Sequence, residues 1–104
     1  MYGTISSFLI KPGHEGAVEE LTQGWLHDHA PRAEGFINEY LLTPAAPASE
    51  RLVLTIFDSE ESYRKNAAAP EQDAWYRQFR AHLEADPEWH DGVITELVRV
   101  TVPL

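Results

Sequence analysis

Segments with the hydrophobic period of a strand and of a helix follow one another along this chain in the order strand, helix, strand, strand, helix, strand. Residues 2–10, YGTISSFLI, are rich in β-branched and aromatic side chains and end at the turn signal Lys11-Pro12-Gly13, which predicts a first strand. From Gly13 onward apolar residues recur at helical spacing. This change of period predicts an amphipathic helix that ends near His29.

The second half of the chain contains two more strands, a helical region and a last strand. The run RLVLTIFD is almost unbroken in apolar residues, as in a strand buried on both faces. Asp58 or Ser59 can cap the helical region, and Pro70 is well placed to begin its second part. The predicted strands are 36–42, 51–58 and 92–102, the last with Ile94, Val98, Val100 and Val102 on one face, and the predicted helical segments are 62–68 and 70–85.

This order of elements predicts a single α+β domain over residues 1–104 with a ferredoxin-like βαββαβ topology. In that topology a four-stranded antiparallel sheet has both helices on one face. Two helices cover only one face of four strands, so the other, apolar face would remain exposed in a monomer. We therefore expect a homodimer through the sheet face, in which two sheets close into a dimeric α/β barrel.

Composition and charge exclude several classes of function. The net charge is -9 with an isoelectric point near 4.8, and the eight basic residues are scattered, so nucleic acid and anionic membranes are not expected partners. The chain has no cysteine, which excludes disulfides and thiolate chemistry. No apolar run approaches a membrane span, and the first residues lack the basic region of a secretion signal. We expect a cytoplasmic protein.

Several short motifs together suggest a family. These are KPG before an amphipathic helix, GF after a loop, the strand-to-helix junction LVLTIFDSEESY, and a helix containing PEQDAWYRQF. In these features the chain resembles the dimeric α/β-barrel superfamily over about residues 2–100, and within it the antibiotic biosynthesis monooxygenase-like branch. The resemblance implies a cofactor-independent monooxygenase that acts on a small aromatic or phenolic substrate, in a cavity between the sheet and the helices.

Candidate site residues follow from the resemblance and from the side chains expected near such a cavity. An aromatic-walled cavity with a few hydroxyl and amide groups suits a planar phenol or quinone. The candidates for deprotonating or orienting the substrate are Asn66, Tyr76 and His90, and those for binding it are Ser6, Phe8, Tyr63, Trp75 and Phe79. The competing interpretation is that the aromatic stripe of the second helical region simply packs against the sheet.

The stretch Trp89-His90-Asp91 has two interpretations. It is either the joint between the last helix and the last strand, with Asp91-Gly92 as the turn, or the position of a general base, His90. The sequence favours the joint, because adjacent residues of an extended segment point in opposite directions and Asp91 is then poorly placed to orient His90.

Two further alternatives are a binding protein without catalysis and a haem-handling protein that uses His82 or His90 as a ligand. The Asn, Trp and His pattern of haem-degrading relatives falls near Ser6, Asn66 and Tyr76, and all three positions depart from it. No metal site is expected, because His27 and His29 are two residues apart on a helix and point about 200° apart.

Overall fold

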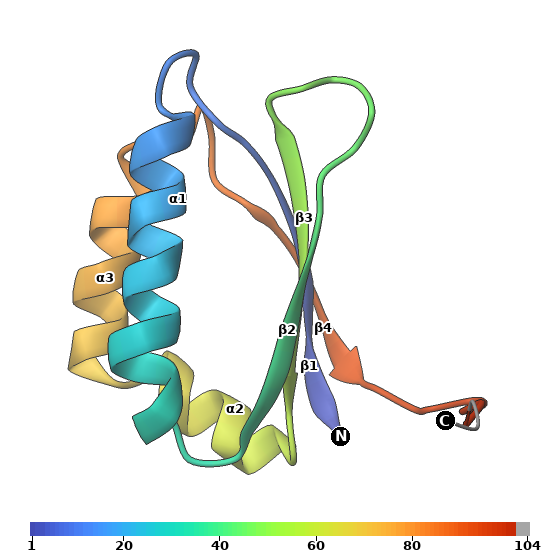
Figure 1. The fold of residues 1–104 in the computed structure, drawn as a ribbon. Coiled ribbons are helices and arrows are strands. Elements are labelled where there is room, and N and C mark those ends of the chain that lie inside the picture. Colours follow the sequence, from blue (N-terminus) through green and yellow to red (C-terminus); the bar gives the residue numbers. More distant parts are fainter. Residues whose placement is uncertain (102–104) are drawn as a thin grey trace.

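The computed structural model of the chain describes residues 1–101 and has the predicted order of elements (Figure 1). A π-helical turn, Trp25–His29, and a short 3-10 turn, Ala30–Arg32, extend the first helix toward the second strand. The main elements are β1 (Tyr2–Leu9), α1 (Glu15–Gly24), β2 (Phe36–Leu42), β3 (Glu50–Phe57), α2 (Glu60–Ala67), α3 (Pro70–Arg80) and β4 (Glu88–Val93).

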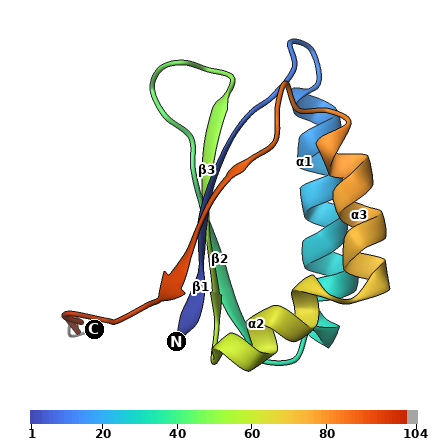
Figure 2. The ribbon, with the colours of Figure 1, turned by 180° about the vertical axis from the view of Figure 1, so that it is seen from behind.

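The four strands form one antiparallel sheet in the order β2-β3-β1-β4. Figures 1 and 2 show α1 and α3 side by side on one face of this sheet, with α2 at the end of the layer they form. The predicted α+β, ferredoxin-like topology with helices on one face is therefore confirmed. The opposite face of the sheet, which we call the outer face, has no helix of the described residues against it.

Local sequence signals begin and end the elements as expected. Ser59 is the N-cap of α2, where its side-chain oxygen accepts a hydrogen bond from the Ser62 N–H at 3.1 Å. Pro70 occupies the first turn of α3, where a missing N–H costs nothing. Gly13, at φ 83°, supplies the left-handed residue of the turn between β1 and α1.

The hydrophobic core lies between the sheet and the two long helices. Its buried members come from β1, α1 and α3 and from the segment just after α3. The rings of Phe8 and Phe79 meet edge to face with centroids 5.1 Å apart, and Leu83 is fully buried beside them. Leu83 also bridges to Ile10, which ties the segment after α3 to the end of β1. This core holds α3 over the sheet.

The last strand differs from the prediction. It spans Glu88–Val93 rather than 92–102, so Trp89-His90-Asp91 lies inside a strand and is not a joint. The reason is the register: β4 runs antiparallel to β1, and Val93 is opposite Tyr2, where β1 begins. After the hydrogen bond from the Ile94 N–H to the Met1 carbonyl, the chain has passed the end of its partner strand.

Residues 94–101 therefore belong to neither helix nor strand, although their sequence alternates as a strand does. This segment leaves the sheet on the side away from the helices (Figures 1 and 2). Leu97 is 92% exposed. Of the face predicted for this strand, Val102 lies outside the described residues. Alternation alone does not make a strand when no partner strand continues beside it.

No helix within residues 1–101 is both long enough and apolar enough to cross a membrane.

Candidate functional site

A cavity of about 690 Å³ lies between the helix-facing side of the sheet and the helices. Residues of all four strands and all three helices line it. Sites for small organic ligands usually have a volume of several hundred cubic ångströms and an apolar lining with a few polar groups. The space that remains shows that the aromatic side chains of α3 pack against the sheet without filling the interior.

Aromatic side chains make the walls of the cavity. Trp75 and Phe79 of α3 stack almost in parallel, with centroids 5.0 Å apart and an interplanar angle of 14°. The indole N–H of Trp75 donates to the Leu21 carbonyl of α1 at 2.8 Å, and that of Trp25 donates to Oε1 of Gln72 at 2.6 Å. These two bonds join the first helical region to α3, so the rings on the helix side of the cavity are held in fixed orientations.

The floor of the cavity includes a line of polar residues that crosses the whole sheet. Glu39 of β2 is opposite Thr55 of β3, Thr55 is opposite Thr4 of β1, and Thr4 is opposite Asp91 of β4. We call these four residues the transverse polar row. Glu39, Thr55 and Thr4 line the cavity, and Thr4 is only 4% exposed. A set of carboxyl and hydroxyl groups thus lies beneath apolar walls.

Glu39 is the carboxyl group of this floor. Its Oε2 accepts a hydrogen bond from the Thr55 hydroxyl at 3.1 Å. Burial, which disfavours the charged form, raises the pKa of Glu39 above 4.5, and the Thr55 bond offsets this in part. A carboxyl group in such surroundings is a stronger proton acceptor than one in water.

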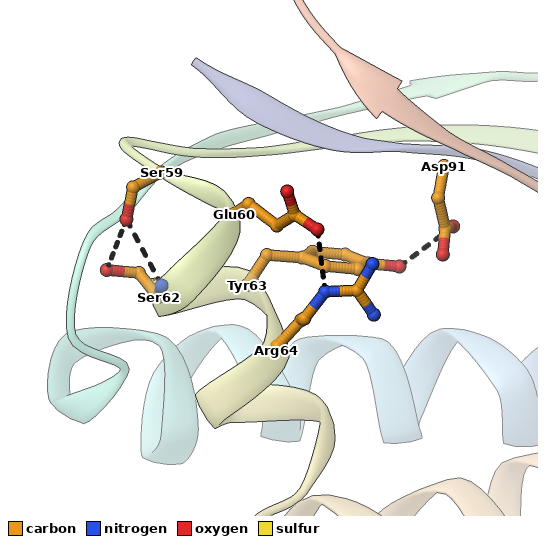
Figure 3. A network of polar contacts seen from close by, with 6 residues as sticks. All are labelled: Ser59, Glu60, Ser62, Tyr63, Arg64 and Asp91. Atoms are coloured by element: carbon orange, nitrogen blue, oxygen red, sulfur yellow. Dashed lines mark hydrogen bonds and ion pairs between the residues drawn. The ribbon is translucent and has the colours of Figure 1, made fainter.

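At the other end of the row, Tyr63 of α2 donates its hydroxyl proton to Oδ1 of Asp91 at 3.0 Å (Figure 3). Burial, this hydrogen bond and the negative charge of Asp91 raise the pKa of Tyr63 to about 12. The Thr4 hydroxyl is near enough to lower that pKa slightly, yet within the described residues it makes no hydrogen bond of good geometry. Tyr63 is therefore a neutral hydrogen-bond donor at physiological pH.

Seven of the eight predicted site residues lie around this one cavity. Ser6 and Phe8 are on its floor from β1, and both are buried. Tyr76 lines it from α3, with its ring centroid 6.2 Å from that of Trp89, and partial burial raises the pKa of Tyr76. The predicted residues that line the cavity are Ser6, Phe8, Tyr63, Asn66, Trp75, Tyr76 and Phe79.

His90 is the predicted residue that the structure does not bring to the cavity. Trp89 lines the cavity and Asp91 bonds Tyr63, so the residue between them on β4 points to the outer face. Its imidazole is exposed there, 3.6 Å from a carboxylate oxygen of Glu88. His82, the other histidine considered, contacts His14 with 2.9 Å between their Nδ1 atoms. Among the described residues no histidine lines the cavity.

Sequence reasoning did not single out Glu39 or Thr55. In FINEYLL, strict alternation does not place Phe36 on the same face as Glu39. An irregularity between Phe36 and Asn38 shifts the register, so that Phe36 and Glu39 both pair with residues of the helix-facing side of β3. The sequence feature that could have pointed to Glu39 is its position as a lone carboxylate in an apolar strand, two residues before Leu41 and therefore on the same face.

The fold and this cavity define a class: a ferredoxin-like α+β domain with an aromatic-walled chamber between sheet and helices. No family model matches the chain, and no curated protein sequence matches it. Solved structures do, and many are described as antibiotic biosynthesis monooxygenases. The resemblance deduced from the sequence is therefore confirmed for the fold.

Three of these structures illustrate the likeness. SnoaB, a cofactor-independent oxygenase from Streptomyces nogalater, is 13% identical with a TM-score of 0.81, over 93% of this chain and 95% of SnoaB. A candidate antibiotic biosynthesis monooxygenase from Caulobacter crescentus is 12% identical with a TM-score of 0.81, over 91% of this chain and 90% of that one. A conserved protein from Methanosarcina mazei is 12% identical with a TM-score of 0.78, over 88% and 89%. At such identities the likeness shows the fold alone.

Proposed function

We propose that this protein binds a small planar hydroxyaromatic molecule in its cavity and oxygenates it to a quinone without metal or flavin. The observation that carries the proposal is the chamber of about 690 Å³ with stacked aromatic walls and a polar floor. Such a chamber buries a flat apolar ring and offers hydrogen bonds to its oxygens. The likeness of fold to SnoaB, which is described as a cofactor-independent oxygenase, supports the same reaction class.

The reaction needs no reductant other than the substrate. One oxygen atom of O2 becomes the new quinone carbonyl, and the other leaves as water with two hydrogens from the phenol. The phenol thereby supplies all four electrons that reduce O2. The protein has to position the ring, accept a proton and keep bulk water away from reactive intermediates.

The residues of the cavity take the following roles. Trp75, Phe79 and Phe8 hold the aromatic ring by stacking and edge contacts. Asn66 and Tyr76 orient the substrate oxygens, and Ser6 and Tyr63 complete the polar lining. His90 points to the outer face, and we assign it no role at the cavity.

The test is oxygen uptake and quinone absorbance with a dihydroxynaphthalene as substrate. We expect one quinone formed for each O2 consumed. Tyr76→Phe should lower turnover at least about tenfold if its hydroxyl orients the substrate. His90→Ala is the matched control and should leave turnover unchanged, since its side chain is on the other face of β4. Tight binding without oxygen uptake would favour the alternative, a binding protein.

A homodimer through the outer face is part of the proposal. Ile5 and Tyr40, on this face, are 46% and 58% exposed, and Leu42 beside them is 58% exposed. Covering such an apolar surface is favourable at about 25 cal/mol for each Å² removed from water. Light scattering on the purified protein should give twice the mass of the chain, and Ile5→Lys should give a monomer. A wild-type protein that stays monomeric at micromolar concentration would refute the dimer.

A further inference from the structure

Glu39 stands apart from every other titratable group of the cavity. It is on strand β2 in the floor of the cavity, and the only side-chain hydrogen bond it makes among the described residues is the one it accepts from Thr55. A carboxylate can accept several hydrogen bonds, so Glu39 retains unused acceptor capacity. A half-buried carboxylate with unused capacity is costly for stability, which calls for a reason at this position.

The other titratable groups that line the cavity do not fit the part of a proton acceptor. Tyr63 and Tyr76 have raised pKa values and stay protonated at neutral pH. Asp73 is paired with Arg77 at 3.0 Å and is exposed on α3. The remaining charged groups are Glu15 and Glu19, exposed on α1, and Arg51, whose guanidinium donates to the carbonyls of Ala48 and Glu50 at 2.6 and 2.8 Å.

We infer that Glu39 is the catalytic proton acceptor of the cavity, and that the ligand is a hydroxylated planar aromatic whose hydroxyl group lies against this carboxylate. The inference rests on the proposed function and adds to it the base and the recognised group. The Thr4 hydroxyl, which has no hydrogen-bond partner among the described residues, is buried two strands away from Glu39 in the same polar row. The negative charge of Glu39 disfavours anionic ligands such as carboxylates and phosphates.

The chemistry assigns Glu39 two cycles, in each of which it accepts a proton and then returns it. First it takes the hydroxyl proton of the phenol, and the electron-rich ring carbon forms a C–O bond to O2. The peroxide anion then takes that proton back from Glu39 and becomes a hydroperoxide. Glu39 next accepts the ring hydrogen from the same carbon, the C–H electrons form the carbonyl, and the O–O bond breaks. The departing hydroxide takes the proton from Glu39 and leaves as water.

This assignment agrees with the electrostatics of the floor. A base works best when its pKa lies near the operating pH, and the raised pKa of Glu39 moves it in that direction. The Thr55 hydroxyl donates to one carboxylate oxygen at 3.1 Å, and the other oxygen has no hydrogen bond among the described residues. A hydrogen bond to a charged acceptor in a dry site is stronger than one to a neutral acceptor.

The test compares the wild type, Glu39→Gln and the control Glu20→Gln, which changes an exposed α1 carboxylate outside the cavity lining. The probes are a dihydroxynaphthalene and the corresponding dimethoxynaphthalene, which has no hydroxyl proton to give. Binding is measured by quenching of tryptophan fluorescence, and turnover by oxygen uptake across the acidic and neutral pH range.

If the inference is right, the wild type and Glu20→Gln prefer the dihydroxy probe by at least about tenfold. Glu39→Gln then loses most of this preference, binds the dimethoxy probe as before, and turns over about 10²- to 10⁴-fold more slowly. The wild-type rate should rise with pH through one ionisation above that of an ordinary carboxyl group.

The outcomes separate the inference from the proposed function. A Glu39→Gln variant with an unchanged hydroxyl preference and unchanged turnover overturns the inference and leaves the function standing. A hydroxyl preference that depends on Glu39, without oxygen uptake by the wild type, supports the recognition of the hydroxyl by Glu39 and overturns the oxygenase. If neither probe binds the wild type, both are overturned.

Discussion

Because of the hydrogen bond between Tyr63 and Asp91, we expect the free energy of unfolding to fall as the pH rises into the alkaline range. Burial together with Asp91 raises the pKa of Tyr63 from 10.0 to about 12. The folded state therefore holds this proton more tightly than the unfolded state. Stability from this group is fully present below about pH 10 and is lost as pH rises through about 12. Two pKa units correspond to at most about 2.7 kcal/mol, and because solvent reaches the half-exposed ring we expect about 1 kcal/mol.

Tyr63→Phe removes the hydroxyl and with it this pH-dependent contribution. Urea unfolding followed by tryptophan fluorescence should show the variant about 1 kcal/mol less stable than the wild type near neutral pH. The difference should then close as pH approaches about 12. Tyr40→Phe, which alters an exposed tyrosine on the outer face, is the control for general alkaline effects. A difference between wild type and Tyr63→Phe that stays constant across this range would mean that folding does not hold the Tyr63 proton more tightly.

Three other substitutions, two of them paired with a control substitution, test the packing, a turn and the floor of the cavity by the same unfolding assay. Leu83→Ala empties a fully buried site and should cost about 2–5 kcal/mol, whereas Leu97→Ala, at a 92% exposed side chain, should change stability by less than about 0.5 kcal/mol. Gly35→Ala should lower stability by more than about 1 kcal/mol, because φ at this residue is +78° and the new Cβ would lie 2.3 Å from Oδ1 of Asp58. Its control, Gly16→Ala in open space on α1, should instead raise stability by about 0.5–1 kcal/mol. Glu39→Gln should be more stable than the wild type at neutral pH and should lose that advantage as pH falls toward 4.5. The raised pKa of Glu39 means that the ionised carboxylate destabilises the folded wild type. Equal stability of variant and wild type at neutral pH would contradict this.

The sequence was sufficient for the architecture because local signals and periodicity agreed with each other. Pro70 begins α3, Ser59 caps α2 and Gly13 forms the turn after β1, each for a reason that belongs to the residue itself. The last strand was misplaced because 92–102 alternates well but has no partner strand beyond Tyr2. Whether a segment pairs as a strand depends on whether a neighbouring strand extends beside it, and the periodicity of the segment itself does not show this.

The sequence predicts the aromatic walls of the cavity more fully than its polar floor. Trp75 and Phe79 follow from helical spacing, so their common face was readable. The position of Glu39 depends on the irregularity between Phe36 and Asn38, which changes the register of a strand and leaves no mark on its composition. The placement of His90 on the outer face has a related cause, since that face is decided by strand β4, which begins at Glu88 and was predicted to begin four residues later, at Gly92.

The transverse polar row also sets the spacing between the polar groups in the floor of the cavity. Neighbouring strands are about 4.8 Å apart, so Glu39, Thr55 and Thr4 follow one another across the sheet in steps of that size. Moving a hydroxyl by two residues along a strand displaces it about 6.6 Å in the perpendicular direction. Exchanging Thr55 with Val53, which lines the cavity from the same face of β3, would therefore move a floor hydroxyl by this distance and favour aromatics with a different spacing of oxygens.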